Sequence, residues 1–384
     1  MKFEHYDDAA LRAQLRGDRF TVVYRIRGGE REALEIAEAM CVEQTVEFPA
    51  RHIECPAIHD GILGQIDYDE DAGDGWRRVD ITYAGEIAGA DFPQFLNVVF
   101  GNSSLIPGIV LERICLPGDM KRTFPGPRFG VEGLRERLGV YGRPLAVTAL
   151  KPMGLPPAAL AEIGYQCALG GIDMLKDDHG LMDQPFASFR ERVEQVAAAV
   201  RRGNEETGGH TAYIPNVSGS LRHMDDRLKL AADCGCGAVM VAPGLMGFDL
   251  IGYAAEKTGL PVVCHPAWLG SSLHRGEGGV DCACLLGQLP RLAGADITVF
   301  PNFGGRFSLT EAECAGIRDM AGEDQGTVRP IFPAPAGGMT FDKVPRMRSF
   351  YGDDAALLMG GGLFTAPGGL AENCRRFIEQ LNKV

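Results

Sequence analysis

Short apolar runs recur through the last two thirds of the chain, and a helical pattern follows each of them. From about Gly139 onward the spacing between runs is roughly 25 to 35 residues, which is typical of a strand–helix repeat. The runs are 146–150, 172–175, 212–215, 238–242, 261–264, 297–300, 330–333 and 356–359. Eight such strands predict a TIM (β/α)8 barrel. A doubly wound open sheet is the alternative, but the chain has no early Gly-rich nucleotide loop.

The first part of the chain has a different rhythm. Its patterns predict strands at 20–26, 76–83 and 109–116, and helices at 30–40 and 91–99. These elements supply three of the four strands and both helices of a βαββαβ-like order, which predicts a small α+β, ferredoxin-like domain. The segment 117–129 is rich in Pro, Gly and basic residues, as a domain connection often is. We therefore predict an α+β domain at 1–125 and the barrel at 126–384.

Charge and composition narrow the class of protein. A net charge of −13 argues against binding to nucleic acid or to an anionic membrane surface. No apolar run has transmembrane length, and the first residues lack the apolar core of a signal peptide. The 11 cysteines include no CxxC pair. We therefore expect reduced thiols in a cytoplasmic protein.

Four ionisable residues directly follow the second predicted barrel strand: Lys176, Asp177, Asp178 and His179. Charges removed from water are costly unless they are paired or bind a metal. Asp178 and His179 suit a divalent cation. Lys176 shares a strand face with Asp178, so it can act as a counter-charge, as a base, or as a ligand once CO2 has carbamylated it. The alternative explanation is an acidic helix N-terminus.

Other strand ends also carry chemical groups, as expected where a barrel places its catalytic residues. Lys151 ends the first strand and suits a general base or an oxyanion holder; the alternative is a lysine that extends from the barrel mouth into water. His265 follows the fifth strand and is either functional or a packed core histidine. Asn216 and Asn302 follow the third and sixth strands.

Glycines follow the seventh and eighth strands, at Gly337 and Gly338 and at 360–362. Backbone N–H groups approach a phosphate closely where no Cβ intervenes, and these two loops are the usual phosphate site of a TIM barrel. Ordinary turn chemistry is the alternative.

Several motifs together resemble the RuBisCO family over most of the chain. They are Leu150-Lys151-Pro152, Gly170 to Asp178, Phe100-Gly101-Asn102, Val42-Glu43, Ala336-Gly337-Gly338 and Gly360-Gly361-Gly362. The resemblance implies a Mg2+ site at a carbamylated Lys176 with Asp178 and His179. It implies phosphate binding at Gly337, Gly338, Gly360 and Gly361. It also implies that Asn102 and Glu43 reach a neighbouring subunit's active site, hence a homodimer or a higher oligomer.

The departures from the family pattern concern carboxylation and the second phosphate. Met153 replaces the second lysine of the first motif, and Pro266 replaces the arginine expected after His265. Phe300 replaces a histidine, and the loop 301–306 lacks the lysine that carboxylation requires, with Arg306 as a partial substitute. Glu47-Phe48 stands where the family has a threonine–tryptophan pair. We infer that the protein is not a carboxylase and that it acts on a sugar monophosphate.

The third metal ligand also departs, because His179 stands where the family has glutamate. Imidazole is softer than carboxylate, so Mg2+ would be held more weakly and Mn2+ or another divalent ion becomes plausible. The alternative is a site that has lost its metal and uses Lys176 as a base.

This pattern is similar to that of RuBisCO-like proteins, whose shared chemistry is metal-assisted proton abstraction next to a carbonyl. His179 counts against the enolase of methionine salvage. Our preferred prediction is isomerisation of 5-methylthioribulose 1-phosphate, with Lys151, Lys176 and His265 as catalytic residues. An apolar pocket for the methylthio group would draw on Phe300, Phe303, Met153 and Trp268, unless these only pack the barrel.

Three alternatives stay open from the sequence. A decarboxylase or hydrolase of 3-oxo-isoapionate 4-phosphate would use Arg306 opposite the substrate carboxylate. A degenerate barrel would have a non-catalytic role, although the retained polar groups at the strand ends argue for altered chemistry. A Schiff-base aldolase would use a lysine without a metal.

Overall fold

The computed structural model describes residues 6–118, 120–124, 126–305, 307 and 309–383. The chain forms two compact units, Met1–Pro125 with Ser271–Gln288, and Gly126–Gly270 with Leu289–Val384. The segment 271–288, which the sequence analysis assigns to the barrel domain, therefore belongs to the first unit.

The first unit is built on a five-stranded sheet of order β10-β4-β1-β3-β2. Its strands are β1 (Arg19–Arg27), β2 (Gln65–Gly73), β3 (Trp76–Ala84), β4 (Ile109–Cys115) and β10 (Gly279–Val280). β1 pairs antiparallel with both β3 and β4, and β10 adds a short parallel edge to β4. The order β4-β1-β3-β2 with its two long helices confirms the α+β prediction.

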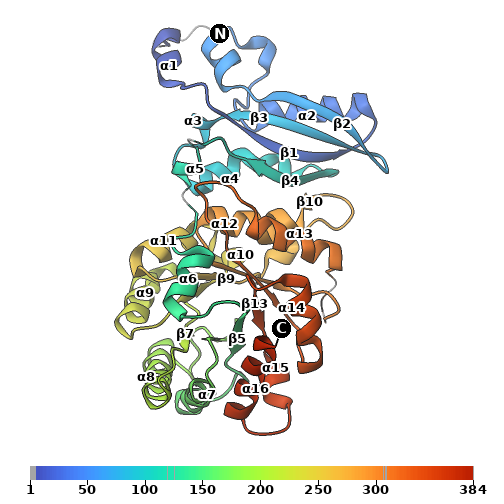
Figure 1. Ribbon diagram of the computed structural model, residues 1–384. Helices are drawn as coiled ribbons and strands as arrows, with labels where there is room; N and C mark the ends of the chain where they lie inside the picture. Colours follow the sequence, from blue (N-terminus) through green and yellow to red (C-terminus); the bar gives the residue numbers. More distant parts are fainter. Residues whose placement is uncertain (1–5, 119, 125, 306, 308, 384) are drawn as a thin grey trace. The chain divides into compact units, whose positions relative to one another are not determined.

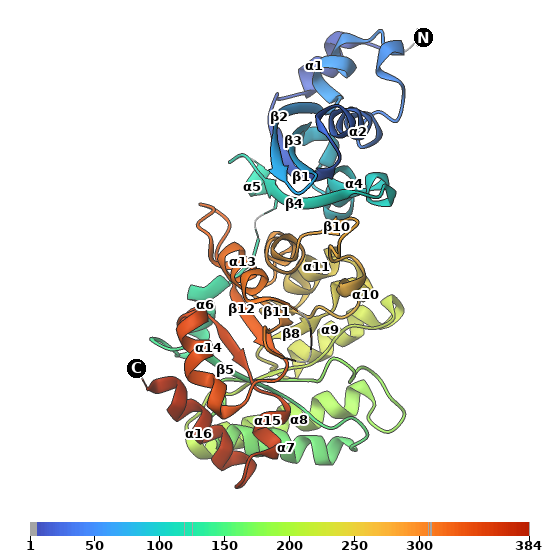
Figure 2. The same ribbon diagram turned by 90° about the vertical axis from the view of Figure 1, so that its right-hand side faces the viewer.

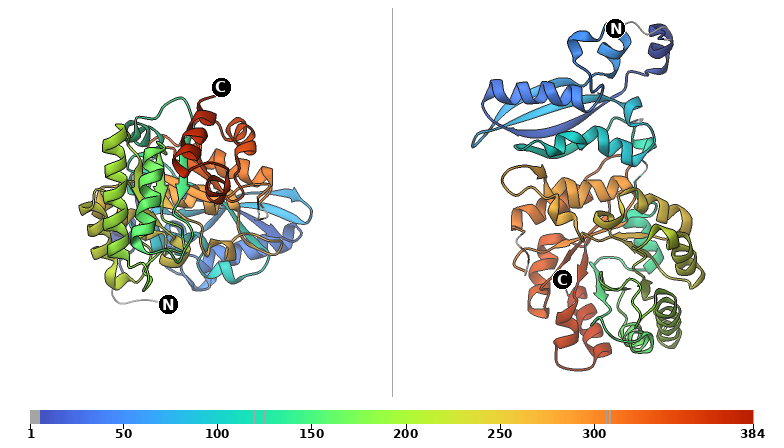
Figure 3. Two further views of the ribbon diagram at one scale, coloured as in Figure 1. Left: turned by 90° about the horizontal axis from the view of Figure 1, so that it is seen from below. Right: turned by 180° about the vertical axis from the view of Figure 1, so that it is seen from behind.

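The helices α2 (Glu30–Glu43) and α4 (Phe92–Phe100) pack on the sheet, where alternation of buried and less buried residues along the strands creates an apolar face. Along β1, Phe20, Val22, Tyr24 and Ile26 are fully buried. The Phe20 ring lies 5.4 Å from Phe95 of α4. Asp91 caps α4 by accepting from the Gln94 N–H. Figure 3 (right) shows α2, in blue, lying along the strands of this unit.

The second unit contains two four-stranded parallel sheets, of orders β13-β5-β6-β7 and β12-β11-β9-β8. A bridge between Asn216 and Met240 joins β7 to β8, and β12 packs beside β13, so the eight strands close a barrel. The strands are β5 (Leu145–Ala149), β6 (Met174–Lys176), β7 (Ala212–Ile214), β8 (Val239–Val241), β9 (Val262–Cys264), β11 (Ile297–Pro301), β12 (Phe332–Ala336) and β13 (Ala356–Leu358). The barrel prediction is confirmed.

Helices cover the outside of these strands (Figures 1 and 2). The main ones are α6 (Gly130–Leu138), α7 (Pro157–Leu169), α8 (Phe189–Thr207), α9 (Met224–Asp233), α11 (Asp249–Thr258), α12 (Leu289–Ala293), α13 (Glu311–Gly322), α14 (Val344–Tyr351) and α16 (Leu370–Asn382). The core between the strands is apolar, with Val147, Met174, Met240 and Val299 among its buried members. Every barrel strand therefore places its last residues at one common end.

No helix within the described part of the chain is long and apolar enough to cross a bilayer. None of the 11 cysteines forms a disulfide, and nine of them are buried. Cys234 is half-buried, and Cys115 is exposed at the last position of β4.

Candidate active site

The carboxyl ends of β5, β6 and β9 bring together the charged groups that the sequence places there. Lys151 Nζ lies 2.7 Å from Asp178 Oδ1, and His179 Nδ1 lies 3.7 Å from the same oxygen. The rings of His179 and His265 stack with their centroids 4.9 Å apart and 8° between their planes. One carboxylate thus lies beside one ammonium group and an imidazole pair.

Lys176 is buried at the last position of β6. Its Nζ donates to the backbone carbonyl of Asp177 at 2.9 Å. Burial lowers the pKa of Lys176 to about 8, with Lys151 adding to the effect and Asp178 and Asp177 opposing it. A lowered pKa gives the neutral amine that general-base chemistry or reaction with CO2 needs.

Asp178 differs from Lys176, because its surroundings favour the charged form of the side chain. Its partial burial acts to raise the pKa, but contacts with His179 and Lys151 and the charges of both lysines hold the pKa well below its usual range. The carboxylate is therefore ionised at neutral pH.

His265 lies deep in the barrel mouth. Burial, together with nearby Lys176 and His179, holds the pKa of His265 well below its usual value, so the imidazole is neutral. Its Nδ1 accepts the Ala267 N–H at 3.2 Å. In the neutral ring this places the hydrogen on Nε2, which makes Nε2 a donor.

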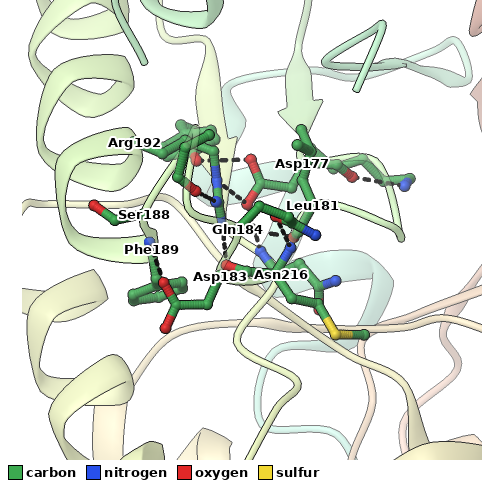
Figure 4. A network of polar contacts seen from close by, with 12 residues as sticks. Asp177, Leu181, Asp183, Gln184, Ser188, Phe189, Arg192 and Asn216 are labelled. Carbon is green, nitrogen blue, oxygen red and sulfur yellow. Dashed lines mark hydrogen bonds and ion pairs between the residues drawn. The ribbon is translucent and has the colours of Figure 1, made fainter. Parts of the chain in front are cut away.

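Asp177, the neighbour of Asp178, is part of a buried network instead (Figure 4). It pairs with Arg192 of α8 at 3.1 Å, and neither side chain is exposed. Its carboxylate also accepts the Tyr213 hydroxyl at 2.8 Å and the Asn216 N–H at 2.9 Å. Burial raises the pKa of Asp177 despite these partners. Its role in the structure is to anchor the chain.

Arg192 extends this network beneath the loop that follows β6. Its guanidinium also donates to the carbonyls of Ala187 and Met182, at 3.2 and 2.8 Å. Asn216 Nδ2 donates to the His179 carbonyl at 2.9 Å. The sequence analysis missed Arg192; the only signal was an arginine inside the apolar face of the helix 189–207.

A divalent ion fits this donor set only under one condition. Within the described ranges, no three His, Cys, Asp or Glu side chains are arranged to hold a metal. Asp178 and His179 supply one carboxylate and one imidazole, while Lys151 and Lys176 are cationic when protonated. A carbamate on Lys176 would remove one positive charge and supply the missing anionic oxygen. The residues therefore fit the ion through a carbamylated Lys176.

The glycine loops after β11, β12 and β13 pack closely against one another. A Cβ at Gly305 would lie 2.4 Å from the Gly337 carbonyl, and one at Gly362 would lie 2.4 Å from the Met339 carbonyl. Gly337 and Gly338 have φ of +90° and +79°. Gly361 faces open space, whereas a Cβ at Gly360 would lie 3.4 Å from Lys151 Cε. This places the predicted phosphate loops beside Lys151.

A lysine that the sequence analysis missed lies across these loops. The half-buried Lys343 donates from Nζ to the carbonyl of Gly338 at 2.9 Å and to that of Gly304 at 3.3 Å. The available signal was a cation five residues after the glycine pair. Arg306, the predicted substitute cation, lies outside the described residues.

Three groups singled out near the sixth strand are packing residues. Asn302 is buried and accepts the Tyr351 hydroxyl at 2.7 Å. Phe300 is fully buried and Phe303 nearly so, with ring contacts to Tyr351 and Phe350. For these two phenylalanines the structure favours barrel packing over a methylthio pocket.

In the first unit, Asn102 and Glu43 meet although they are far apart in sequence. Asn102 Nδ2 donates to Glu43 Oε1 at 2.9 Å. Between them the buried Gln44 donates to the carbonyls of Asn97 and Val98 and accepts the Ser103 N–H. The end of α2 and the end of α4 are thus fixed to each other, which presents the two polar side chains as a pair.

Exposed large apolar side chains concentrate at the carboxyl end of the barrel. In the described part of the second unit, six of seven lie in the segments that each follow a different strand. We name these six the apolar rim: Met153, Phe186, Leu221, Leu245, Trp268 and Phe307. The seventh, Tyr141, precedes β5. Apolar groups exposed around a polar site indicate a ligand or partner surface.

Comparison with known proteins is consistent with this geometry. A family model described as the ribulose bisphosphate carboxylase large chain, catalytic domain, matches residues 130–376. The chain is 37% identical to the 5-methylthioribulose-1-phosphate isomerase of Rhodospirillum rubrum, over 94% of this chain and 96% of the isomerase. It is 34% identical to the 2,3-diketo-5-methylthiopentyl-1-phosphate enolase of Geobacillus kaustophilus, over 80% and 75% of the two chains.

The fold agrees as well. The crystal structure of a RuBisCO-like protein from Rhodopseudomonas palustris superposes with a TM-score of 0.84 at 40% identity, covering 95% of this chain and 97% of the other. The family match covers more than half of the chain, and these relatives are RuBisCO-like proteins rather than carboxylases. This protein therefore belongs to the RuBisCO large-chain family, among its RuBisCO-like members.

Proposed function

We propose that this protein isomerises 5-methylthioribulose 1-phosphate by moving a proton from a carbon next to the keto group. The observation that carries the proposal is the cluster of Lys151, Lys176, Asp178 and a neutral His265 at the strand ends. The 37% identity to an isomerase of this substrate supports the choice of substrate.

The metal ligands in this proposal are Asp178, His179 and a carbamylated Lys176, with Mg2+ or another divalent ion. When bound, the ion stabilises negative charge on the substrate carbonyl oxygen. In the proposal the phosphate binds at Gly337, Gly338, Gly360 and Gly361, where the lack of a Cβ lets backbone N–H groups approach it closely.

The chain's own groups then handle the proton. In this proposal Lys151 enters the reaction as its neutral amine: Nζ takes the proton from the carbon next to the keto group and returns it to another carbon of the same substrate. In between, Asp178 at 2.7 Å stabilises the ammonium. His265 Nε2 donates a hydrogen bond to a substrate oxygen that gains charge. Burial of His265 is useful here, because it keeps the imidazole neutral and able to donate from Nε2.

In the assembly we propose, Glu43 and Asn102 of one subunit complete the site of another, so the functional unit is a homodimer or a larger oligomer. The observation in support is their mutual hydrogen bond, which keeps both side chains presented together.

The test is deuterium uptake from D2O into 5-methylthioribulose 1-phosphate, followed by NMR with MgCl2 and bicarbonate. We expect exchange next to the keto group, with an isomerised product, in the wild type but not in Lys176→Ala. Lys229→Ala, an exposed lysine paired with Asp233 on α9, is the matched control and should exchange normally. Absence of exchange in the wild type would contradict the proposal, and 3-oxo-isoapionate 4-phosphate would be assayed next.

A further inference from the structure

Trp268 differs from the rest of the apolar rim in its backbone. It has φ of +73°, and the other described non-glycine residues with positive φ are Glu47 and Asp74. The left-handed region is a genuine outlier for a bulky side chain, and such strain concentrates at ligand-binding segments. The side chain is also 72% exposed.

The surrounding backbone fixes this conformation. A Cβ on Gly244, in the short helix α10 (Pro243–Met246) after β8, would lie 2.4 Å from the Ala267 carbonyl and 3.1 Å from the Trp268 carbonyl carbon. Leu269 is buried, and its N–H donates to Pro266 at 3.0 Å. The backbone at 267–269 is therefore held by close packing against Gly244 and by the turn that begins at Pro266.

The position of Trp268 relates it to the reacting groups. It lies three residues after His265, whose ring stacks on His179. Around the barrel, β9 is separated from β12 by β11, and from β13 by β11 and β12, so the Trp268 loop borders neither glycine loop. A ligand whose phosphate is at the glycine loops would extend its other end toward Trp268.

The chemistry of this segment suits an uncharged, polarisable group. From 265 to 270 the chain reads His-Pro-Ala-Trp-Leu-Gly and contains no lysine or arginine. An indole makes favourable contacts with a thioether sulfur and its methyl group, but it cannot compensate a second phosphate.

We propose that Trp268 is the specificity-determining residue that contacts the methylthio group of the substrate. This inference rests on the proposed function, because it assigns the non-phosphate end of the same substrate. Discrimination then depends on burial of the methylthio group against the indole.

The test compares 5-methylthioribulose 1-phosphate with ribulose 1-phosphate, which has a hydroxyl in place of the methylthio group. In Trp268→Gly we expect the ratio of the two kcat/KM values to fall on the order of 10-fold, mainly through KM of the methylthio substrate. Glycine accepts φ of +73° without strain, so this variant should keep its thermal stability. Trp268→Phe should retain most of the selectivity, and Tyr141→Ala, at the other end of the barrel, should retain all of it.

A binding measurement separates this inference from the proposed function. The chain has two tryptophans, so Trp76→Phe leaves Trp268 as the sole indole. We expect its fluorescence to change with 5-methylthioribulose 1-phosphate and not with inorganic phosphate. That change without isomerisation would support the inference and contradict the proposed function. Isomerisation with an unchanged selectivity ratio in Trp268→Gly would overturn the inference alone. Neither binding nor turnover would overturn both.

Discussion

Asp177 and Asp178 are neighbours in sequence, yet Asp177 belongs to a buried network and Asp178 lies at the candidate active site. The Asp177 carboxylate is fully buried beneath the loop after β6 and pairs with Arg192. The Asp178 carboxylate faces the barrel mouth beside Lys151 and is 18% exposed. Burial raises the pKa of Asp177, whereas contacts with His179 and Lys151 outweigh burial and lower the pKa of Asp178.

The difference shows how one strand end can supply both rigidity and chemistry. Because successive residues of an extended chain point to opposite sides, one carboxylate anchors the loop and the next remains available to a ligand. Variants should therefore separate stability from activity between positions 177 and 178.

The largest expected effect is on activity at position 178. Asp178→Asn should lower the isomerisation rate by roughly three orders of magnitude, because it removes a proposed ion ligand and the partner of Lys151. Its free energy of unfolding should change by less than about 1 kcal/mol, since the pair is partly exposed. Steady-state kinetics and urea unfolding measure the two quantities. A large loss of stability in Asp178→Asn would contradict the assignment of activity to position 178 and of stability to position 177.

The next effect is on stability at position 177. Asp177→Asn leaves the buried Arg192 charge uncompensated, so the free energy of unfolding should fall by about 3–5 kcal/mol. Arg192→Met in the same chain should recover most of this loss, because the uncompensated charge is gone. Urea unfolding of the wild type, both single variants and the double variant gives the coupling energy. Strictly additive losses would show that the two side chains do not act as a pair.

The third prediction concerns pH. Burial lowers the pKa of Lys176 to about 8, below that of an unfolded lysine. Below pH 8 the folded chain thus contains a buried ammonium at a cost of roughly 3 kcal/mol, and this cost disappears as the pH rises to the unfolded pKa. Without bicarbonate and divalent metal, Lys176→Met should be more stable than the wild type at pH 7, with the difference shrinking above pH 8.

Urea unfolding at several pH values between 7 and 10 tests whether the stability difference between Lys176→Met and the wild type shrinks as the pH rises. Lys229→Met removes an exposed lysine of α9 and provides the control, since its stability relative to the wild type should not follow the same curve. A Lys176→Met advantage that stays constant with pH would contradict a lowered pKa.

The smallest effect is expected at Asn216, which links the two regions. Asn216→Ala removes hydrogen bonds to the His179 carbonyl and the Ser218 N–H, so stability should fall by about 1–2 kcal/mol and activity about 10-fold. Asn204→Ala loses two comparable bonds to Thr211 at the other end of the barrel and should lose stability only. Equal activities of the two variants would exclude a positioning role for Asn216.

The sequence predicts the barrel strands well because each is a short apolar run, buried on both sides. It does not indicate β2, whose residues Gln65–Gly73 are polar and mostly exposed. An edge strand of this kind is stabilised by backbone pairing with β3, which leaves little pattern in its side chains. Nor does it indicate β10, which has two residues.

The sequence likewise predicts some features of the candidate site and not others. Charges at strand ends predict that Lys151, Lys176, Asp178 and His265 lie together, because parallel strands end at one face. Alternation places Lys176 and Asp178 on one side, but it cannot identify Arg192 as the partner of Asp177. Pairing between distant segments, such as Asn102 with Glu43, depends on the tertiary fold; the family resemblance singled out both residues but did not predict the hydrogen bond between them.

The segment Ser271–Gln288 has a consequence for how the protein is made. The Gln288 side chain bonds both backbone groups of Ile114, 174 residues earlier in the chain, and β10 pairs with β4. During synthesis the first unit is therefore incomplete when Pro125 leaves the ribosome. Its last strand arrives only after β5 to β9 have been made, so neither unit can finish folding before most of the chain exists. A gene cut after Pro125 would yield a first unit with β4 as an open edge.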